Sequence, residues 1–146
     1  MKPIALGSDH AGYALKARLI DHLKSRGFET VDYGCGDVPR AEYPEYSEKV
    51  ARAIQRGDSR LGVLVCGTGY GISLAANRVR GIRAVPCSEP YTAMLSRQHN
   101  DTNILCLGAR VIGPEFAVMI LNAWLDAEFQ GGRHSERLAL IDRIEP

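Results

Sequence analysis

A cysteine stands at the start of a glycine-rich loop in the middle of this sequence. The apolar run that ends at Cys66 is followed by the loop GTGYG (67–71) and then by a helical pattern. Backbone N–H groups at a helix N-terminus hold an anion, either a phosphate or a developing oxyanion. A helix N-terminus or a nearby cation lowers the pKa of a free thiol from roughly 8.5 to about 7 or below. Cys66 is therefore a candidate base or nucleophile, although a cysteine at a strand end is more often part of the core.

The loop matches neither of two well-known phosphate-binding motifs. A P-loop needs a lysine directly after its last glycine, and no lysine stands near residues 67–71. A dinucleotide-binding loop reads G-x-G-x-x-G, and Ile72 occupies the position of its third glycine. Glu89 follows at the distance of a ribose-binding acid, so binding of NAD remains a weaker alternative.

A second set of candidate residues lies near the start of the last predicted helix. Arg133 and Arg137 are four residues apart, which places them on one face of a helix. Paired guanidinium groups grip a phosphate with forked donors. An ordinary solvated helix face is the alternative, which Glu136 favours. His99 lies in the polar run SRQHNDTN (96–103), where the simplest interpretation is a surface loop.

Alternating strand and helix patterns position these residues. Strands are predicted over 3–8, 28–34, 60–66, 81–87 and 102–108. Helices are predicted over 11–27, 46–55, 72–79, 90–97, 114–129 and from about 135. This order predicts an α/β fold, with a five-stranded, mostly parallel sheet and helices on both faces. Ligands of such sheets bind beyond the carboxyl ends of the strands, which is where Asp9, His10, Cys66 and Arg110 are expected.

Length, charge and cysteine spacing narrow the class of protein. The 146 residues suit a single domain spanning 1–146, and the net charge of +1 provides no basic field for nucleic acid or a membrane surface. The N-terminus lacks the apolar stretch of an export signal. The cysteines are widely spaced, which argues against a zinc site and fits reduced thiols in a cytoplasm. We interpret Cys35, Cys87 and Cys106 as structural.

Five short motifs occur in order along the chain: GSDHAG (7–12), CGTGYGIS (66–73) with AAN (75–77), GIRA (81–84), SRQHNDTN (96–103) and GGRH (131–134). Together they resemble the ribose-5-phosphate isomerase B family, which includes allose- and galactose-6-phosphate isomerases. The resemblance covers the whole chain. It implies a Rossmann-like three-layer α/β/α sandwich that uses no metal or organic cofactor. It also implies interconversion of ribose 5-phosphate and ribulose 5-phosphate through a cis-enediolate, a step of the pentose phosphate pathway.

The resemblance also implies roles for individual residues. Cys66 matches the general base of the family's cysteine branch, since Ile72 stands where another branch carries a glutamate. Thr68 matches a residue that assists proton movement between the substrate oxygens, and His99 matches one proposed for ring opening. The positions that match substrate contacts are Asp9, His10, Gly67, Gly69, Tyr70, Gly71, Asn100, Arg110, Arg133 and Arg137. Among these, the loop stabilises the enediolate, and His10 and the arginines hold the phosphate.

The family forms homodimers or tetramers whose active sites are built by two subunits. The resemblance therefore implies that Cys66 comes from one subunit and that His99 and Asn100 come from its partner. We expect the C-terminal helix, about 133–146, to contact that partner. A six-carbon aldose-phosphate isomerase is the alternative enzyme, and a sugar-phosphate-binding module is the alternative without catalysis.

Overall fold

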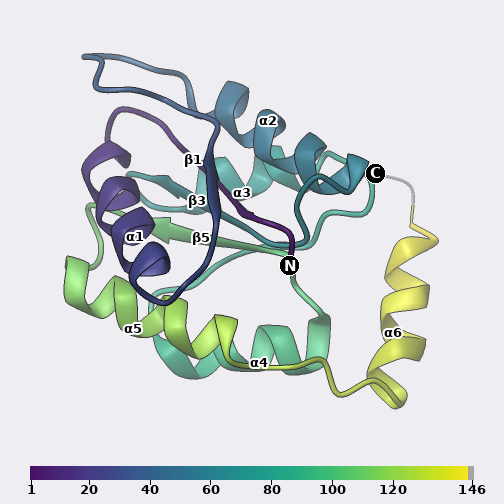
Figure 1. Ribbon diagram of the computed structural model, residues 1–146. Coiled ribbons are helices and arrows are strands. Elements are labelled where there is room, and N and C mark those ends of the chain that lie inside the picture. Colours follow the sequence, from purple (N-terminus) through teal and green to yellow (C-terminus); the bar gives the residue numbers. More distant parts are fainter. Residues whose placement is uncertain (145–146) are drawn as a thin grey trace.

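A five-stranded sheet forms the centre of the structure, a computed structural model that describes residues 1–144 (Figure 1). The strands, in the spatial order β2-β1-β3-β5-β4, are β1 (Ile4–Ser8), β2 (Thr30–Asp32), β3 (Gly62–Cys66), β4 (Ala84–Pro86) and β5 (Ile104–Gly108). The helices are α1 (Tyr13–Ser25), α2 (Tyr43–Arg56), α3 (Tyr70–Ala76), α4 (Pro90–Asn100), α5 (Pro114–Leu125) and α6 (Arg133–Asp142). Within the described chain, no helix is both long and apolar enough to cross a membrane.

Helices cover both faces of the sheet, which confirms the three-layer α/β/α sandwich (Figure 1). Helices α1, α4 and α5 pack on one face, and α2 and α3 pack on the other. All neighbouring strands are parallel, where the sequence predicts a mostly parallel sheet. Every residue of β1, β3 and β5 is buried, as is typical of strands covered on both sides. Helix α1 buries Leu15, Leu19 and Leu23, since residues three or four apart share one helical face.

Helix α3 starts inside the glycine loop. The sequence predicts a helix over 72–79, but the structure begins it at Tyr70 and ends it at Ala76. Gly69 precedes the first turn with φ of 84°, a left-handed backbone conformation that residues other than glycine rarely adopt. The loop is therefore a tight turn whose last two residues, Tyr70 and Gly71, are already helical.

Helix α4 is longer than the sequence predicts. The predicted range is 90–97, whereas the helix continues to Asn100 and therefore includes His99. The surface-loop interpretation of His99 is thus wrong. Asp101 ends the helix in a left-handed conformation, with φ of 45°, and short polar side chains tolerate that region better than most.

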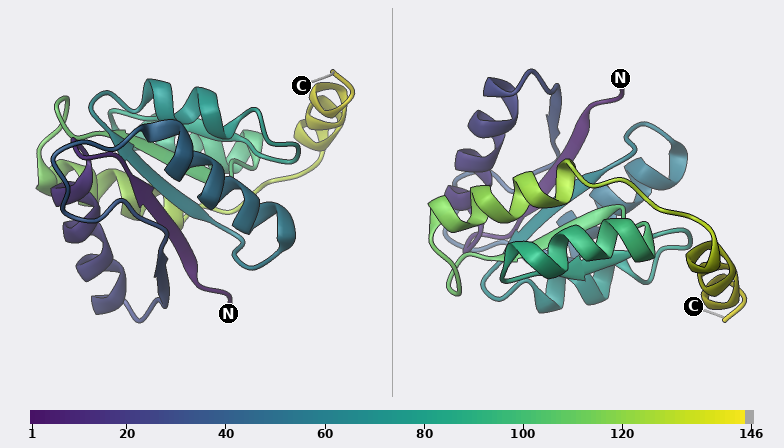
Figure 2. Two further views of the ribbon diagram at one scale, coloured as in Figure 1. Left: turned by 90° about the horizontal axis from the view of Figure 1, so that it is seen from above. Right: turned by 90° about the horizontal axis from the view of Figure 1, so that it is seen from below.

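Helix α6 stands at the edge of the molecule, apart from the three layers (Figure 2). An ion pair joins its end to the body, with 3.0 Å between Arg83 Nη2 and Asp142 Oδ2. Leu140 and Ile141 are more than half exposed. The helix ends at Asp142, and positions 145–146 of the predicted range lie outside the described residues. Its contact with a partner subunit stays a prediction.

Candidate functional site

The thiol of Cys66 lies at the carboxyl end of β3, against the first turn of α3. Its Sγ accepts a hydrogen bond from the backbone N–H of Gly69 at 3.1 Å. The N–H of Tyr70 donates to Thr68 Oγ1 at 3.2 Å. A backbone N–H that points at sulfur stabilises negative charge on it. Because Cys66 is only 4% exposed, its thiol faces the loop rather than bulk water.

The glycine loop packs closely against the end of β5, and the guanidinium of Arg110 lies beside it. A Cβ built on Gly108 would lie 2.6 Å from the carbonyl oxygen of Thr68, so only a glycine fits there. A Cβ on Gly67 would lie 3.3 Å from Nη1 of Arg110. The exposed guanidinium of Arg110 therefore lies next to the loop, at the edge where the sequence predicts it.

Asp9 and His10 reach the same edge because β1 and β3 are neighbouring parallel strands. The order of strands reverses between β1 and β3, which is where open α/β sheets bind ligands. Asp9 is buried, and its Oδ1 accepts the N–H of Gly12 at 3.0 Å. Nδ1 of the exposed His10 lies 3.2 Å from both the backbone nitrogen and the carbonyl oxygen of Ala41, so the backbone of Ala41 holds the imidazole ring at this edge.

Tyr43, the first residue of α2, is a member of this edge that the sequence analysis missed. A Cβ on Gly71 would lie 2.6 Å from Cζ of Tyr43, so the phenol ring rests on the first turn of α3. The ring is partly open to solvent, with 37% of the residue exposed. Tyr43 precedes the helix that the sequence predicts over 46–55, and no spacing or motif indicates that it packs on the glycine loop.

Glu89 has a structural role that removes the main support for NAD binding. Its carboxylate caps α4 by accepting the N–H groups of Tyr91 at 2.6 Å and Thr92 at 2.9 Å. The hydrogen bond from the Thr92 hydroxyl is the largest cause that lowers the pKa of Glu89. The carboxylate that stands at the distance of a ribose-binding acid therefore already serves as a helix cap.

The three other cysteines behave as the sequence predicts. Cys35 and Cys106 are buried, and Cys87 is half-buried. Burial, reinforced by the charge of Glu89, raises the pKa of Cys87 to about 11, and burial raises the pKa of Cys106 well above its usual value. Both thiols stay protonated near neutral pH. Among the residues that the structure describes, no group of three or more His, Cys, Asp or Glu side chains is placed to hold a metal ion.

The remaining candidates gather where α6 begins beside the end of α4. The imidazole rings of His99 and His134 stack, with centroids 4.4 Å apart and planes inclined by 10°. Desolvation, and then the charges of Arg133, His99 and Arg137, lower the pKa of His134 from its usual 6.5. Both arginines are exposed on α6. We call this group the α4/α6 cluster; it comprises His99, Asn100, Arg133, His134 and Arg137.

The α4/α6 cluster and the glycine loop lie at opposite ends of the sheet within one chain. Cys66 pairs with Gly108 at the carboxyl end of β5, whereas α4 ends at Asn100, just before β5 begins at Ile104. The five residues of β5 span roughly 13 Å at the rise of a strand. In Figure 1 the β5 arrow accordingly points away from α6. One copy of the chain therefore does not bring all the predicted residues together.

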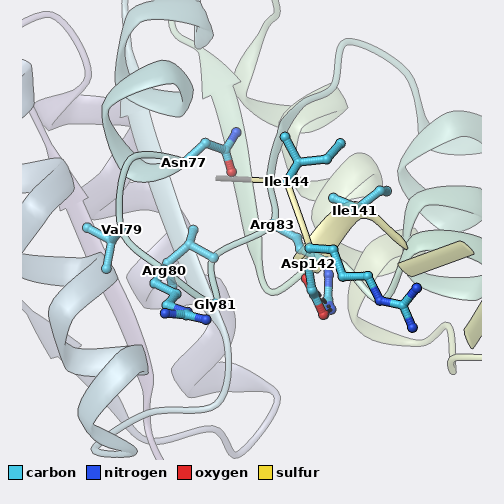
Figure 3. Close-up of a pocket in the computed structure, with 10 residues that line it drawn as sticks. Asn77, Val79, Arg80, Gly81, Arg83, Ile141, Asp142 and Ile144 are labelled. Atoms are coloured by element: carbon cyan, nitrogen blue, oxygen red, sulfur yellow. Dashed lines mark hydrogen bonds and ion pairs between the residues drawn. The ribbon is translucent and has the colours of Figure 1, made fainter. Parts of the chain in front are cut away.

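A cavity of about 700 Å³ lies between the end of α6 and the segment over 77–83 (Figure 3). Arg83 and Asp142, which form the ion pair, line it together with the apolar side chains of Val79 and Ile141. None of the predicted site residues lines this cavity. A smaller cavity of about 60 Å³ lies at the glycine loop instead, where Thr68 and Tyr70 line it.

Comparison with known proteins finds the same family of isomerases over nearly the whole chain. A family model described as ribose/galactose isomerase matches residues 4–141. The chain is 54% identical to ribose-5-phosphate isomerase B of Escherichia coli over 145 residues, covering 99% of this chain and 97% of that protein.

Solved structures agree with the sequence comparison. Ribose-5-phosphate isomerase B from Clostridium thermocellum superposes with a TM-score of 0.97 at 51% identity, covering 99% of this chain and 97% of the other. A Mycoplasma genitalium ribose-5-phosphate isomerase B with bound ribulose 5-phosphate superposes with a TM-score of 0.92 at 38% identity, covering 97% and 94%. These values show a common fold at identities well above those of unrelated proteins.

Proposed function

This chain belongs to the ribose/galactose isomerase family, and from that premise we propose that it interconverts D-ribose 5-phosphate and D-ribulose 5-phosphate. The observation that carries the proposal is the buried thiol of Cys66, whose Sγ accepts an N–H from the glycine loop that follows it. Asp9 and His10 reach the same edge of the sheet. The relatives in Escherichia coli and Clostridium thermocellum that bear this activity in their names match nearly the full chain.

The first chemical step opens the sugar ring. Ribose 5-phosphate is mostly a furanose, in which the carbonyl is masked. The anomeric O1 hydroxyl gives up its proton, the bond between C1 and O4 breaks, and O4 takes up a proton, which leaves an open-chain aldehyde. We assign this proton exchange to His99, because imidazole both accepts and donates protons near neutral pH.

The second step moves a hydrogen between two carbons. The Cys66 thiolate removes the proton from C2, the electron pair forms the C1–C2 double bond, and O1 becomes negative. Thr68 relays a proton from O2 to O1, and the thiol then returns its proton to C1 as the C2 carbonyl forms. Backbone N–H groups of the 67–71 loop are placed to stabilise the enediolate oxygen.

The phosphate and the sugar hydroxyls supply remote binding energy for positioning. Arg110 stands beside the loop, His10 reaches the same edge of the sheet, and Asp9 is placed there to accept a sugar hydroxyl. Arg133 and Arg137 belong to the α4/α6 cluster at the opposite end of the sheet, which supports a site shared by two subunits of a homodimer. Each site would combine the loop of one subunit with the α4/α6 cluster of its partner.

An assay of ribulose 5-phosphate formation tests the proposal. The purified protein is given ribose 5-phosphate without added metal or cofactor, and we expect saturable turnover of roughly 1–1000 per second. Turnover only with allose 6-phosphate would replace the five-carbon substrate with a six-carbon one. Tight binding without exchange of substrate protons with solvent would indicate a binding module and contradict catalysis.

Replacing Arg137 with alanine tests the phosphate grip. We expect KM for ribose 5-phosphate to rise about ten- to a hundredfold, with kcat changed far less. A charged hydrogen bond contributes about 1.5–3 kcal/mol, and binding energy shared by ground and transition states appears in KM. Arg143→Ala, at an exposed arginine just beyond α6, is the matched control. An unchanged KM in Arg137→Ala would assign that side chain to the solvated helix face.

A further inference from the structure

We infer that His134 positions His99 for ring opening by presenting a flat ring face to its imidazole. The inference rests on the proposed function, because it concerns the step assigned to His99. His134 is 5% exposed and His99 is half-buried, so the stack is shielded on one side and open on the other. The planes differ by only 10°, which is a stacked arrangement rather than an edge contact.

The His99 ring needs such a support. The torsion that turns an imidazole about its last bond is broad and has no sharp minimum. Within residues 1–144, the side chain of His99 takes part in no hydrogen bond, so nothing but packing sets the plane of its ring. Turning the ring out of that plane would separate it from His134. The stack therefore keeps both nitrogen atoms in the plane in which they reach a sugar oxygen.

The backbone holds His134 in register with His99. The N–H of Gln130 donates to the carbonyl oxygen of Gln98 at 3.0 Å, which ties the segment before α6 to the end of α4. Gly131 and Gly132 then turn the chain with φ of 66° and 59°, in the left-handed region that favours glycine. Helix α6 thus begins beside His99, and its second residue, His134, falls on the ring.

The chemistry of His134 fits a support rather than a second acid or base. Its Nε2 is buried and has no hydrogen-bond partner among the described residues. Desolvation and the neighbouring charges of Arg133, His99 and Arg137 lower its pKa, so that the ring is neutral near pH 7. A neutral neighbour leaves the proton exchange to His99 alone.

Two apolar substitutions of His134 distinguish the effect of a flat ring from the effect of filling the same space. His134→Phe keeps a flat ring, whereas His134→Leu fills the space without one. We expect His134→Phe to retain kcat for ribose 5-phosphate within about threefold, and His134→Leu to lose roughly ten- to a hundredfold, since small misplacements of a reacting group carry such costs. Thermal unfolding of both variants establishes that they are folded.

A double-variant cycle shows whether the effect acts through His99. In a His99→Asn background, His134→Leu and His134→Phe are expected to have equal kcat, because no imidazole is left to position. A loss of the same size in both backgrounds would overturn the inference, as would equal activity of His134→Phe and His134→Leu in the parent. If the parent itself shows no isomerisation, the proposed function fails, which is distinct from failure of the inference alone.

Discussion

Cys66→Ala is expected to lower kcat for ribose 5-phosphate roughly a hundred- to ten-thousandfold while KM stays within about threefold. A positioned general base contributes roughly 10²–10⁴ in rate, and neighbouring positions offer no replacement. Ile72, in the following helix, cannot take a proton, and Thr68 engages the N–H of Tyr70. Binding survives because the phosphate and hydroxyl contacts come from other residues. Steady-state kinetics, with isothermal titration of substrate to the variant, measure the two effects separately.

Cys87→Ala is the control for this prediction. Its thiol, close to the same edge of the sheet, has a pKa raised to about 11 and is protonated at the pH of the assay. We expect its kcat to stay within twofold of the parent. If Cys66→Ala turned over at a rate near that of the parent, the base would have to be another group.

The second large expected effect is that two variants, each nearly inactive alone, regain activity when they are combined in one dimer. One chain carries Cys66→Ala and the other carries His99→Asn with Arg137→Ala, and different affinity tags allow the mixed dimer to be purified. In a shared-site dimer, one of the two sites receives both defects and the other receives none. We therefore expect about half the activity of the parent dimer from two variants that are each nearly inactive.

The physical reason for this result is the direction of the helices. Helix α4 returns the chain from the carboxyl to the amino end of the sheet, so His99 finishes roughly 13 Å or more from Cys66. A mixed dimer of Cys66→Ala with Thr68→Ala is the matched control. Both changes lie in the same loop, each site then carries one defect, and no activity should return. Recovery in this control, or its absence in the first mixture, would contradict the shared site.

The sequence alone determined the local features of this protein. Continuous apolar runs predicted β1, β3 and β5, because strands covered on both faces expose no side to water. The helical spacing of leucines predicted the buried face of α1. Cys66 and its loop followed from residue types next to one another in the chain. These properties depend on neighbours within a few residues, which is the range over which a periodic pattern carries information.

Only the tertiary structure decided which distant residues meet. It inserted β5 between β3 and β4, placed Tyr43 on Gly71 and stacked His134 on His99. It also divided the candidate site between two ends of the sheet. Such contacts depend on how whole elements pack, and packing is decided by side-chain complementarity between segments far apart in sequence. Even when each helix and strand is correctly predicted, the sequence pattern does not say which other elements it packs against.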